Sequence, residues 1–556
     1  MNIEAWLLTI IVFVPTLGAF FCLLVPRASI RWVAVAATLL TLIASLFCFG
    51  MYFQGDGGGQ ANPFGSSYGH LHYGFRLPWI RGENFTIEYF VGLDGLSFPL
   101  LILTTLVSFL ACLASWNFDH WTNNRGIRAY FILFLLLETG MLGVFVSLDF
   151  FLFYIFWEVM LLPMYFLIGV WGGPRKEYAA IKFFLFTLAG SVLMLVALLA
   201  MYFYSADAIR QAMTAQGGGI PSAYRPGVTL TGGTFDLIEL STNLAIQTYF
   251  KSDGLLFLET FRFAPTMFML LFIGFAIKLP SFPFHTWLPD AHVEAPTPIS
   301  MILAGILLKM GGYGFLRLCY PIFPTGGVFW AYTLAVVAVI SILYGALCAM
   351  AQSDFKKLVA YSSVSHMGYV LLGVAVMTTT GFQGAMFQMI AHGVSSPMCF
   401  FLVGVIYERA HHREINRFGG LWLTMPKYGS MATLGFFASL GLPGLCGFIG
   451  EVYVLLGTFQ ARDKFPWAVP MAILAAAGVI LTAGYILWLI QRVYLGRERE
   501  EYKGFAEATP REMAVLIPFG ALAILLGILP DQSLFAFMNG TLDLMLSHIR
   551  SMTGIA

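Results

Sequence analysis

The chain has 556 residues, of which 59% are hydrophobic and 11% are charged, and its formal net charge is +1. A soluble domain carries about 25% charged residues, so this composition excludes an ordinary soluble protein, and the balanced charge excludes a strongly basic nucleic-acid-binding protein. Apolar sequence continues from end to end, which predicts an all-α, polytopic membrane protein forming one integral membrane domain over residues 1–556.

The N-terminus, Met1-Asn2-Ile3-Glu4, leads directly into apolar sequence without a basic region or a small-residue cleavage site. We therefore expect a retained first helix and no signal peptide. The seven cysteines lie in apolar stretches and form no Cys-x-x-Cys pair, which is typical of small buried hydrophobic residues. The sequence contains no iron–sulfur or zinc spacing, no phosphate loop and no nucleophile elbow. It therefore predicts neither a cofactor nor a metal site in this chain.

About fourteen apolar segments are candidates for transmembrane helices, each of which needs roughly 20 residues. In chain order they cover residues 6–25, 32–53, 93–116, 130–147, 150–171, 179–204, 265–288, 299–318, 329–350, 358–377, 384–407, 429–459, 469–495 and 513–528.

Basic residues favour one side of this arrangement. Short loops on one side carry most of the Lys and Arg residues, including Arg27, Arg175 and Lys357. On the other side most basic residues lie in two long segments, 55–88 and 205–262, which are rich in Gly, Thr and Ser; Arg317 falls on this side too. The positive-inside rule predicts that the short loops are cytoplasmic and that both termini lie outside. The long segments could be hairpins, helices or disorder.

Seven titratable residues stand out inside the predicted helices, and neither of the two lysines among them belongs to the loop sets. They are Glu138, Glu158, Lys278, Lys309, His366, His392 and Glu451. A charge at the bilayer centre costs about 2.5 to 3.5 kcal/mol, so each of these residues is expected to have a structural or functional role that offsets this cost. Each could be a fixed ion pair or a packing anchor. Titratable groups on successive helices are what a proton relay requires, since a buried Lys releases its proton readily and His can accept a proton at one ring nitrogen and donate from the other.

Two of the apolar segments are interrupted by groups of helix-breaking residues. Pro280 and Pro283 follow Lys278 and interrupt the helical hydrogen-bond ladder. Gly441-Leu442-Pro443-Gly444 does the same before Glu451. Irregular backbone at membrane depth is tolerated only inside protein or beside water. Paired interruptions are typical of repeats in transporters, so we expect two broken helices and two inverted repeats.

Ordered motifs surround these residues. They are VGLDGLS at 91–97, FWE at 156–158, WGG at 171–173, KLP at 278–280, HTWLPDAH at 285–292, LAGILLKMGGYG at 303–314, AYSSVSHMG at 360–368, MIAHG at 389–393, GGLW at 419–422 and GFIGE at 447–451. In this order the chain resembles subunit M (chain 4) of NADH:quinone oxidoreductase, respiratory complex I, within the family of Mrp-type cation/proton antiporters. The acid at Glu451 and the stretch Tyr407-Glu408-Arg409 resemble the subunit M branch.

The resemblance implies a proton relay. Its members are Glu158, Lys278, Lys309, His366, His392 and Glu451. In this family the acid at Glu158 pairs with Lys278 at the first broken helix, and the acid at Glu451 ends the relay towards the outside. Glu138 is left without a role.

The resemblance also implies an organisation: N-terminal helices in 1–116, a first antiporter-like repeat in 129–318, a second in 329–495 and a C-terminal helix in 511–556. The expected partners are the other complex I membrane subunits, especially the neighbouring antiporter-like ones, and the lipid bilayer. Quinone is reached only through the assembled complex, and no nucleic acid is expected. FMN and iron–sulfur clusters are expected in partner subunits. The expected location is a bacterial plasma membrane.

The predicted function is proton translocation driven by quinone reduction in neighbouring subunits, as part of a translocating NADH:quinone oxidoreductase and without a redox centre of its own. One alternative is a subunit of an Mrp-type Na⁺/H⁺ antiporter; another is a subunit of a related membrane-bound hydrogenase. Both would use the same relay and differ in partners or electron donor. A solute carrier would instead need a polar substrate pocket, and a membrane enzyme with its own active site would need a catalytic constellation that the sequence lacks.

Overall fold

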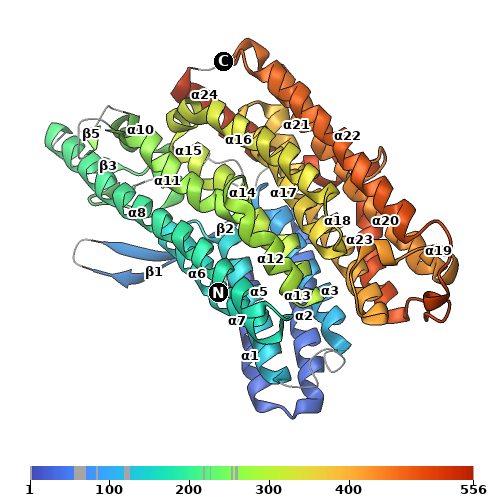
Figure 1. The fold of residues 1–556 in the computed structure, drawn as a ribbon. Helices are drawn as coiled ribbons and strands as arrows, with labels where there is room; N and C mark the ends of the chain where they lie inside the picture. Colours follow the sequence, from blue (N-terminus) through green and yellow to red (C-terminus); the bar gives the residue numbers. More distant parts are fainter. Residues whose placement is uncertain are drawn as a thin grey trace.

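The computed structural model describes residues 3–54, 71–82, 85–117, 126–216, 219–225, 227–251, 255–256 and 261–554. Within this part the chain forms one bundle of roughly parallel helices, with α8 along one side and α22 along the other (Figure 1). Twelve of the described helical segments are long and apolar enough to cross a membrane. The length and apolarity of these segments make each a spanning helix that satisfies its own backbone hydrogen bonds.

The first half of the bundle begins with α1 (Ile3–Leu24), α2 (Ile30–Gln54) and α3 (Ser97–Ala114). Three spans follow, formed by α5 (Ile127–Val146), by α6 (Phe150–Val159) with α7 (Leu161–Trp171), and by α8 (Lys176–Gln216). The interruption between α6 and α7 at Met160 has a local cause. Pro163 lacks an N–H group, and its ring clashes with the carbonyl of Val159 four residues earlier.

The next span is broken, as predicted. α11 (Phe263–Lys278) ends at Lys278, and the chain resumes helical structure only at Phe284–Thr286 and α12 (Trp287–Glu294). The fifth span of this half joins α13 (Thr297–Ile302), α14 (Leu308–Gly314) and α15 (Tyr320–Ile322) through π-helical segments at Leu303–Leu307 and Phe315–Cys319. Such wide turns are frequent at functional sites.

The second half repeats this order. Three continuous helices, α16 (Pro324–Met350), α17 (Phe355–Ala375) and α18 (Thr379–Ala410), precede a broken span of α20 (Pro426–Leu440) and α21 (Cys446–Gln460). α19 (Leu421–Thr424) lies before α20, and α22 (Ala468–Val493) completes the half. In the five spans from α5 to α15, as in the five from α16 to α22, the fourth span is broken. Because five is odd, the second half starts on the opposite side, which supports the predicted inverted repeats; the residue limits set for them stay a prediction.

Twelve continuous segments and two broken ones account for the fourteen predicted spans within the described residues. The prediction for residues 511–556 was wrong in one respect. This stretch forms two helices, α23 (Pro510–Ile528) and α24 (Ala536–Thr553), with a π-helical turn at Asp531–Phe535 between them. Pro530 and the polar residues Asp531 and Gln532 separate the two apolar runs, so a single helix is not maintained.

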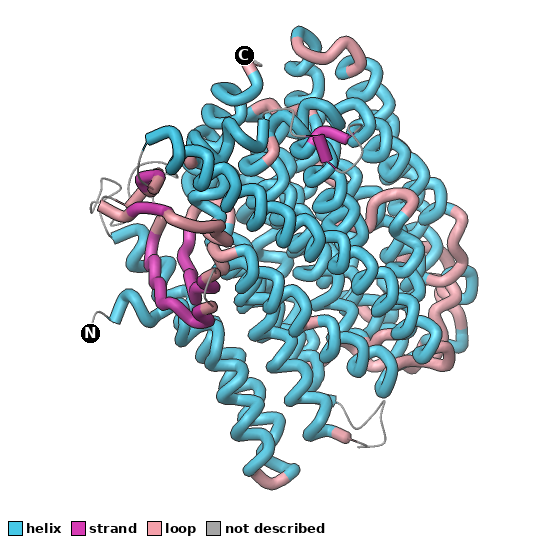
Figure 2. The backbone as a smooth tube through the Cα atoms, turned by 90° about the vertical axis from the view of Figure 1, so that its left-hand side faces the viewer, coloured by secondary structure: helices cyan, strands magenta, loops and turns pink. Residues whose placement is uncertain are grey.

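The two long loop segments adopt defined structure where they are described. In the first, β1 (His72–Arg81) and β2 (Thr86–Leu93) form an antiparallel hairpin at the side of the helix bundle (Figure 2), with the last residues of β2 buried; residues 55–70 and 83–84 lie outside the described part. The second contains the end of α8 and six short elements: β3 (Ile220–Pro221), β4 (Thr229–Leu230), α9 (Leu237–Thr242), α10 (Leu244–Lys251), β5 (Leu255–Leu256) and β6 (Phe261–Arg262).

The segment between α5 and α6 joins both long loops. Leu148 N donates to Phe90 O on β2 at 2.9 Å, and Leu237 N donates to Leu148 O at 2.9 Å. Asp149 caps α6 by accepting from the N–H groups of Phe151 and Leu152, and it also accepts from Glu88 N. These bonds tie the start of α6 to the hairpin and to the second long loop.

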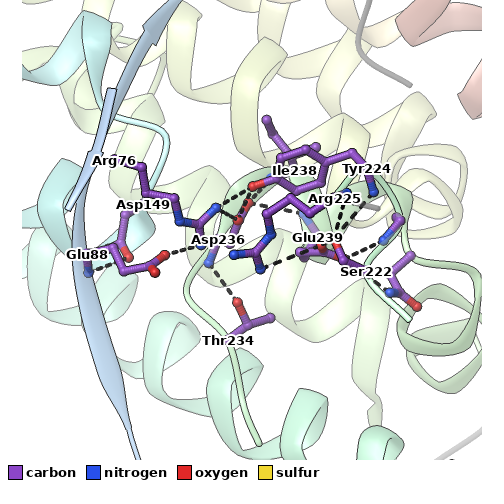
Figure 3. Close-up of polar contacts among 12 residues, drawn as sticks. Arg76, Glu88, Asp149, Ser222, Tyr224, Arg225, Thr234, Asp236, Ile238 and Glu239 are labelled. Atoms are coloured by element: carbon purple, nitrogen blue, oxygen red, sulfur yellow. Dashed lines mark hydrogen bonds and ion pairs between the residues drawn. The ribbon is translucent and has the colours of Figure 1, made fainter. Parts of the chain in front are cut away.

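A cluster of charged side chains reinforces this junction (Figure 3). We call it the outer cluster; it comprises Arg76, Glu88, Asp149, Tyr224, Asp236 and Glu239. Arg76 Nη1 donates to Asp236 Oδ2 at 2.7 Å and to the Tyr224 hydroxyl at 2.5 Å, and Arg76 also pairs with Glu88. One guanidinium thus joins β1, β2 and the second long loop, through charge-assisted hydrogen bonds that are stronger than neutral ones.

Candidate functional site

The most direct contact between predicted relay residues joins α14 to α18. Lys309 Nζ lies 2.7 Å from His392 Nδ1 and also donates to the carbonyl of Ala304, within the π-helical turn that precedes α14. Lys309 is fully buried and His392 is 3% exposed. An amine and an imidazole at this distance share a hydrogen bond through which a proton can pass.

A second contact joins α17 to α21. His366 Nδ1 lies 3.2 Å from Glu451 Oε1, and His366 Nε2 lies 3.3 Å from the Ser439 hydroxyl on α20. Both His366 and Glu451 are buried. Because each His366 nitrogen has a polar neighbour, this imidazole is oriented to pass a proton between the interior and Glu451.

The two contacts belong to one series. The rings of His366 and His392 are 5.7 Å apart between centroids. Among the described residues, His392 Nε2 has no hydrogen-bond partner. The structure therefore places Lys309, His392, His366 and Glu451 in a single buried file that crosses α14, α18, α17 and α21. Sequence reasoning named all four residues but not the order of their contacts.

The second broken helix shapes the end of this file. Gly441, at the end of α20, has φ +80°, and a Cβ built there would lie 2.9 Å from Glu451 Oε2. Glycine adopts this left-handed conformation without a Cβ penalty. The interruption thus brings backbone directly against the Glu451 carboxylate.

The first broken helix holds Lys278 differently. Lys278 is 1% exposed, and its Nζ lies 5.4 Å from the ring centroids of Trp157 on α6 and Phe183 on α8. Aromatic faces attract a cation, by about 2 kcal/mol when it is desolvated. Among the described side chains, Lys278 Nζ finds no hydrogen-bond acceptor.

Glu158 is close enough to Lys278 for its charge to act on the ammonium. However, no ion pair within 4.0 Å joins the two in the part of the chain that is described. Their direct pairing stays a prediction. Among the described residues, no hydrogen bond links Lys278 to Lys309, although α14 packs closely on α11: a Cβ at Gly311 would lie 2.5 Å from Phe275 O.

Three buried polar groups escaped the sequence reasoning or were placed wrongly. Arg317 was grouped with the outer loops, but it lies inside the Thr297–Ile322 span, where its Nη2 is 2.5 Å from Asp94 Oδ1. The segment was taken to end at residue 318, whereas helix continues to Ile322. Lys356, counted with the loops, is 5% exposed and donates to Ala295 O at 2.6 Å. His292, in a motif but without an assigned role, is fully buried.

Glu138, which had no assigned role, lies on α5 with both carboxylate oxygens buried and without partners among the described residues. Within the described part of the chain, neither oxygen hydrogen-bonds to a predicted relay residue, so Glu138 is not joined to the file by a hydrogen bond.

A fold of fourteen spans with two broken helices and a buried file of titratable groups defines the class of antiporter-like membrane proteins. The family model described as NADH:quinone oxidoreductase/Mrp antiporter matches residues 147–220 and 228–483, and the model of the NADH-ubiquinone oxidoreductase chain 4 amino terminus matches residues 77–143. The chain belongs to this family, in the branch of NADH-quinone oxidoreductase subunit M and chain 4.

Individual relatives agree over nearly the whole length. NADH-quinone oxidoreductase subunit M of Rhodobacter capsulatus is 40% identical, with 94% of this chain and 93% of the relative covered. In solved structures, the chain is similar to one in respiratory complex I from Thermus thermophilus, with a TM-score of 0.77, 28% identity, and 98% of this chain and 100% of that chain covered. A chain of the Mrp complex from Dietzia sp. shares the fold, with a TM-score of 0.75, 19% identity and full coverage of both chains.

Proposed function

We propose that the chain is a proton-translocating membrane subunit of respiratory complex I, in which Glu158, Lys278, Lys309, His366, His392 and Glu451 carry protons across the membrane. The observation that carries the proposal is the buried file from Lys309 through His392 and His366 to Glu451, with contacts of 2.7 Å at one end and 3.2 Å at the other. Fixed ion pairs would not need two adjacent imidazoles, whereas a relay uses groups that both accept and donate protons.

Lys278 is suited to control the file. Its ammonium is held by aromatic faces with no hydrogen-bond acceptor among the described residues, and a negative charge on the nearby Glu158 would favour its protonated form. Redox-driven changes in neighbouring subunits that weaken the influence of Glu158 would release the Lys278 proton towards Lys309. Water is the natural bridge between the two lysines, since Lys278 Nζ has no hydrogen-bond partner among the described residues.

The energies are adequate for transport. Moving one charge against 100 mV requires about 2.3 kcal/mol. A change of about two units in the pKa of a buried group corresponds to about 2.7 kcal/mol. One switch in the electrostatic environment of the relay is therefore enough to move one proton against a typical membrane potential.

The assembly supplies the redox chemistry in this proposal. FMN and iron–sulfur clusters belong to partner subunits, quinone is reached through the complex, and the neighbouring antiporter-like subunits and lipid surround this chain. The membrane is a bacterial plasma membrane, with the short basic loops in the cytoplasm and both termini outside.

The test compares Lys309→Ala and Lys278→Ala with the unaltered protein in the assembled complex. Proton pumping per NADH oxidised is measured in sealed vesicles, and Lys427→Ala, at an exposed position in the first turn of α20, is the control. We expect pumping to be lost in both relay variants and kept in the control. Normal pumping by either relay variant would refute the relay.

A second measurement separates complex I from the Mrp alternative. After mild-detergent purification, the native assembly is assayed for NADH:quinone reductase activity. Co-purification with flavin and iron–sulfur subunits and NADH oxidation support the proposal. Recovery with antiporter-like subunits alone, without redox activity, would favour the Mrp-type antiporter with the same relay residues.

A further inference from the structure

His292 on α12 is a buried histidine whose two ring nitrogens have no hydrogen-bond partner among the described residues. It is 0% exposed, and its ring stacks on Phe400 of α18 with centroids 4.2 Å apart and an interplanar angle of 10°. Packing alone would favour an apolar ring at this position, because unsatisfied buried polar atoms are unfavourable. Unpaired buried nitrogens of this kind point to bound water.

His292 lies between the relay and the basic face of the molecule. On the relay side, Phe400, on which the His292 ring stacks, belongs to the same helix as His392, α18; the charge of Lys309 also reaches His292. On the other side, the charge of Lys356 acts on it; Lys356 is buried near the start of α17, where its Nζ donates to Ala295 O at 2.6 Å, three residues beyond His292.

Charged groups continue from this point to the surface. Arg413 donates to Val293 O at 2.6 Å and pairs with Asp354 at 3.3 Å. Glu294, next to Val293, accepts from the backbone N–H of Arg175 at 3.0 Å, and the Arg175 side chain is 58% exposed. The last turn of α12 is thus surrounded by polar groups that run from the exposed loop to the buried imidazole.

We propose that His292 is a relay residue on the uptake side, passing protons from water beside Lys356 and Glu294 to the Lys309–His392 pair. This inference rests on the proposed function. It adds a seventh residue to the relay, on the side from which the Lys309–His392 pair takes up protons.

The proton balance is simple. A proton from water beside Lys356 binds one ring nitrogen of His292, and the proton on the other nitrogen passes through water to the neutral amine of Lys309. Rotation of the ring or proton exchange with water then restores the starting tautomer. Only N–H and O–H bonds form and break, and one proton leaves for each that enters.

The experiment uses the assembled complex in sealed vesicles with the basic face outward. His292→Phe keeps a ring that can stack on Phe400 but removes both nitrogens. His292→Gln keeps hydrogen-bonding groups but cannot accept and donate a proton in turn. Phe400→Leu is the matched control, since it changes the packing partner and leaves the imidazole. Subunit content is checked on native gels, and the His292→Gln variant carries the test if the Phe variant does not assemble.

We expect both His292 variants to pump as poorly as Lys309→Ala, with Phe400→Leu close to the unaltered protein. We also expect residual pumping by the His292 variants to fall more steeply than that of the unaltered protein when the outside pH is raised, because proton uptake from that side has become limiting. Normal pumping by His292→Gln, or equal losses in His292→Phe and Phe400→Leu, would overturn the inference while leaving the relay intact. Normal pumping by Lys309→Ala would instead refute the proposed function.

Discussion

Gly441 lies directly against Glu451: a methyl group at Gly441 would stand 2.9 Å from Oε2 of the carboxylate. The backbone at the break in the second interrupted span therefore packs directly against Glu451, the last residue of the file. The same local feature, a left-handed glycine, ends a helix and leaves room for a titratable group.

The first prediction uses a matched pair of glycines in this break. Gly441 and Gly444 have φ +80° and +90°, so alanine at either position carries a similar backbone strain of about 1–2 kcal/mol. Only the Cβ at Gly441 meets Glu451, because nothing lies within 4 Å of a Cβ at Gly444. We expect Gly441→Ala to reduce proton pumping several-fold and Gly444→Ala to leave it nearly unchanged at equal subunit content. Equal losses would mean that strain in the loop, and not the Glu451 environment, controls the rate.

The second prediction concerns the buried ion pair of Asp94 and Arg317, which are 2% and 4% exposed at their side chains. Removing one partner of such a pair typically costs about 3–5 kcal/mol because a charge is left buried. We expect Arg317→Leu to lower the temperature at which the subunit leaves the assembly, and the double variant Asp94→Asn with Arg317→Leu to recover most of the loss. The readout is subunit retention on native gels after heating. A double variant as unstable as the single one would show that Arg317 acts through other contacts.

The spans and the relay residues could be predicted from sequence for the same physical reason. A membrane helix needs about 20 apolar residues, and a charge inside one is expensive, so Lys278, Lys309 and Glu451 stand out from their surroundings. The breaks could be predicted because Pro280 and Gly441-Leu442-Pro443-Gly444 cannot continue a helix. Apolar length, a charge within an apolar segment and a helix-breaking residue are all local features, so each can be recognised from sequence alone.

What could not be predicted depends on contacts between distant segments. The pairing of Lys309 with His392 joins residues 83 positions apart. His292 falls between two predicted spans, so nothing in its neighbourhood marks it as buried. The outer cluster joins Arg76 to Asp236 across 160 positions, in loops where a charge is inexpensive and carries no signal.

The third prediction is a pH dependence of stability at the outer cluster. Burial, together with the charges of Asp236 and Glu88, raises the pKa of Asp149 to about 7. The hydrogen bonds that Asp149 accepts from Leu152 N and Glu88 N lower its pKa but do not offset this rise. The folded chain therefore holds a proton that the unfolded chain releases near pH 4. Its contribution to stability is complete below about pH 4 and is lost as the pH rises through about 7.

We expect the temperature of subunit release to fall between pH 5 and pH 8, and Asp149→Asn to remove part of that fall. Asn is as good an N-cap as Asp, so α6 keeps its first hydrogen bonds in this variant. Arg76, which pairs with both Glu88 and Asp236, stays charged over this range. An unchanged pH profile in Asp149→Asn would show that another group controls it.

The fourth prediction tests the orientation proposed from the basic loops. Trp79 on β1 is 52% exposed and the Glu500 side chain is 87% exposed, so a cysteine at either position is open to reagent from its own side. Six of the seven native cysteines are buried and Cys348 is partly buried, so background labelling is low. With a membrane-impermeant thiol reagent, we expect Trp79→Cys to be labelled in intact cells and Glu500→Cys only in inverted vesicles. The reverse pattern would place the hairpin in the cytoplasm. Because the inlet beside Lys356 lies with the basic loops, such a reversal would also invert the direction in which His292 passes protons.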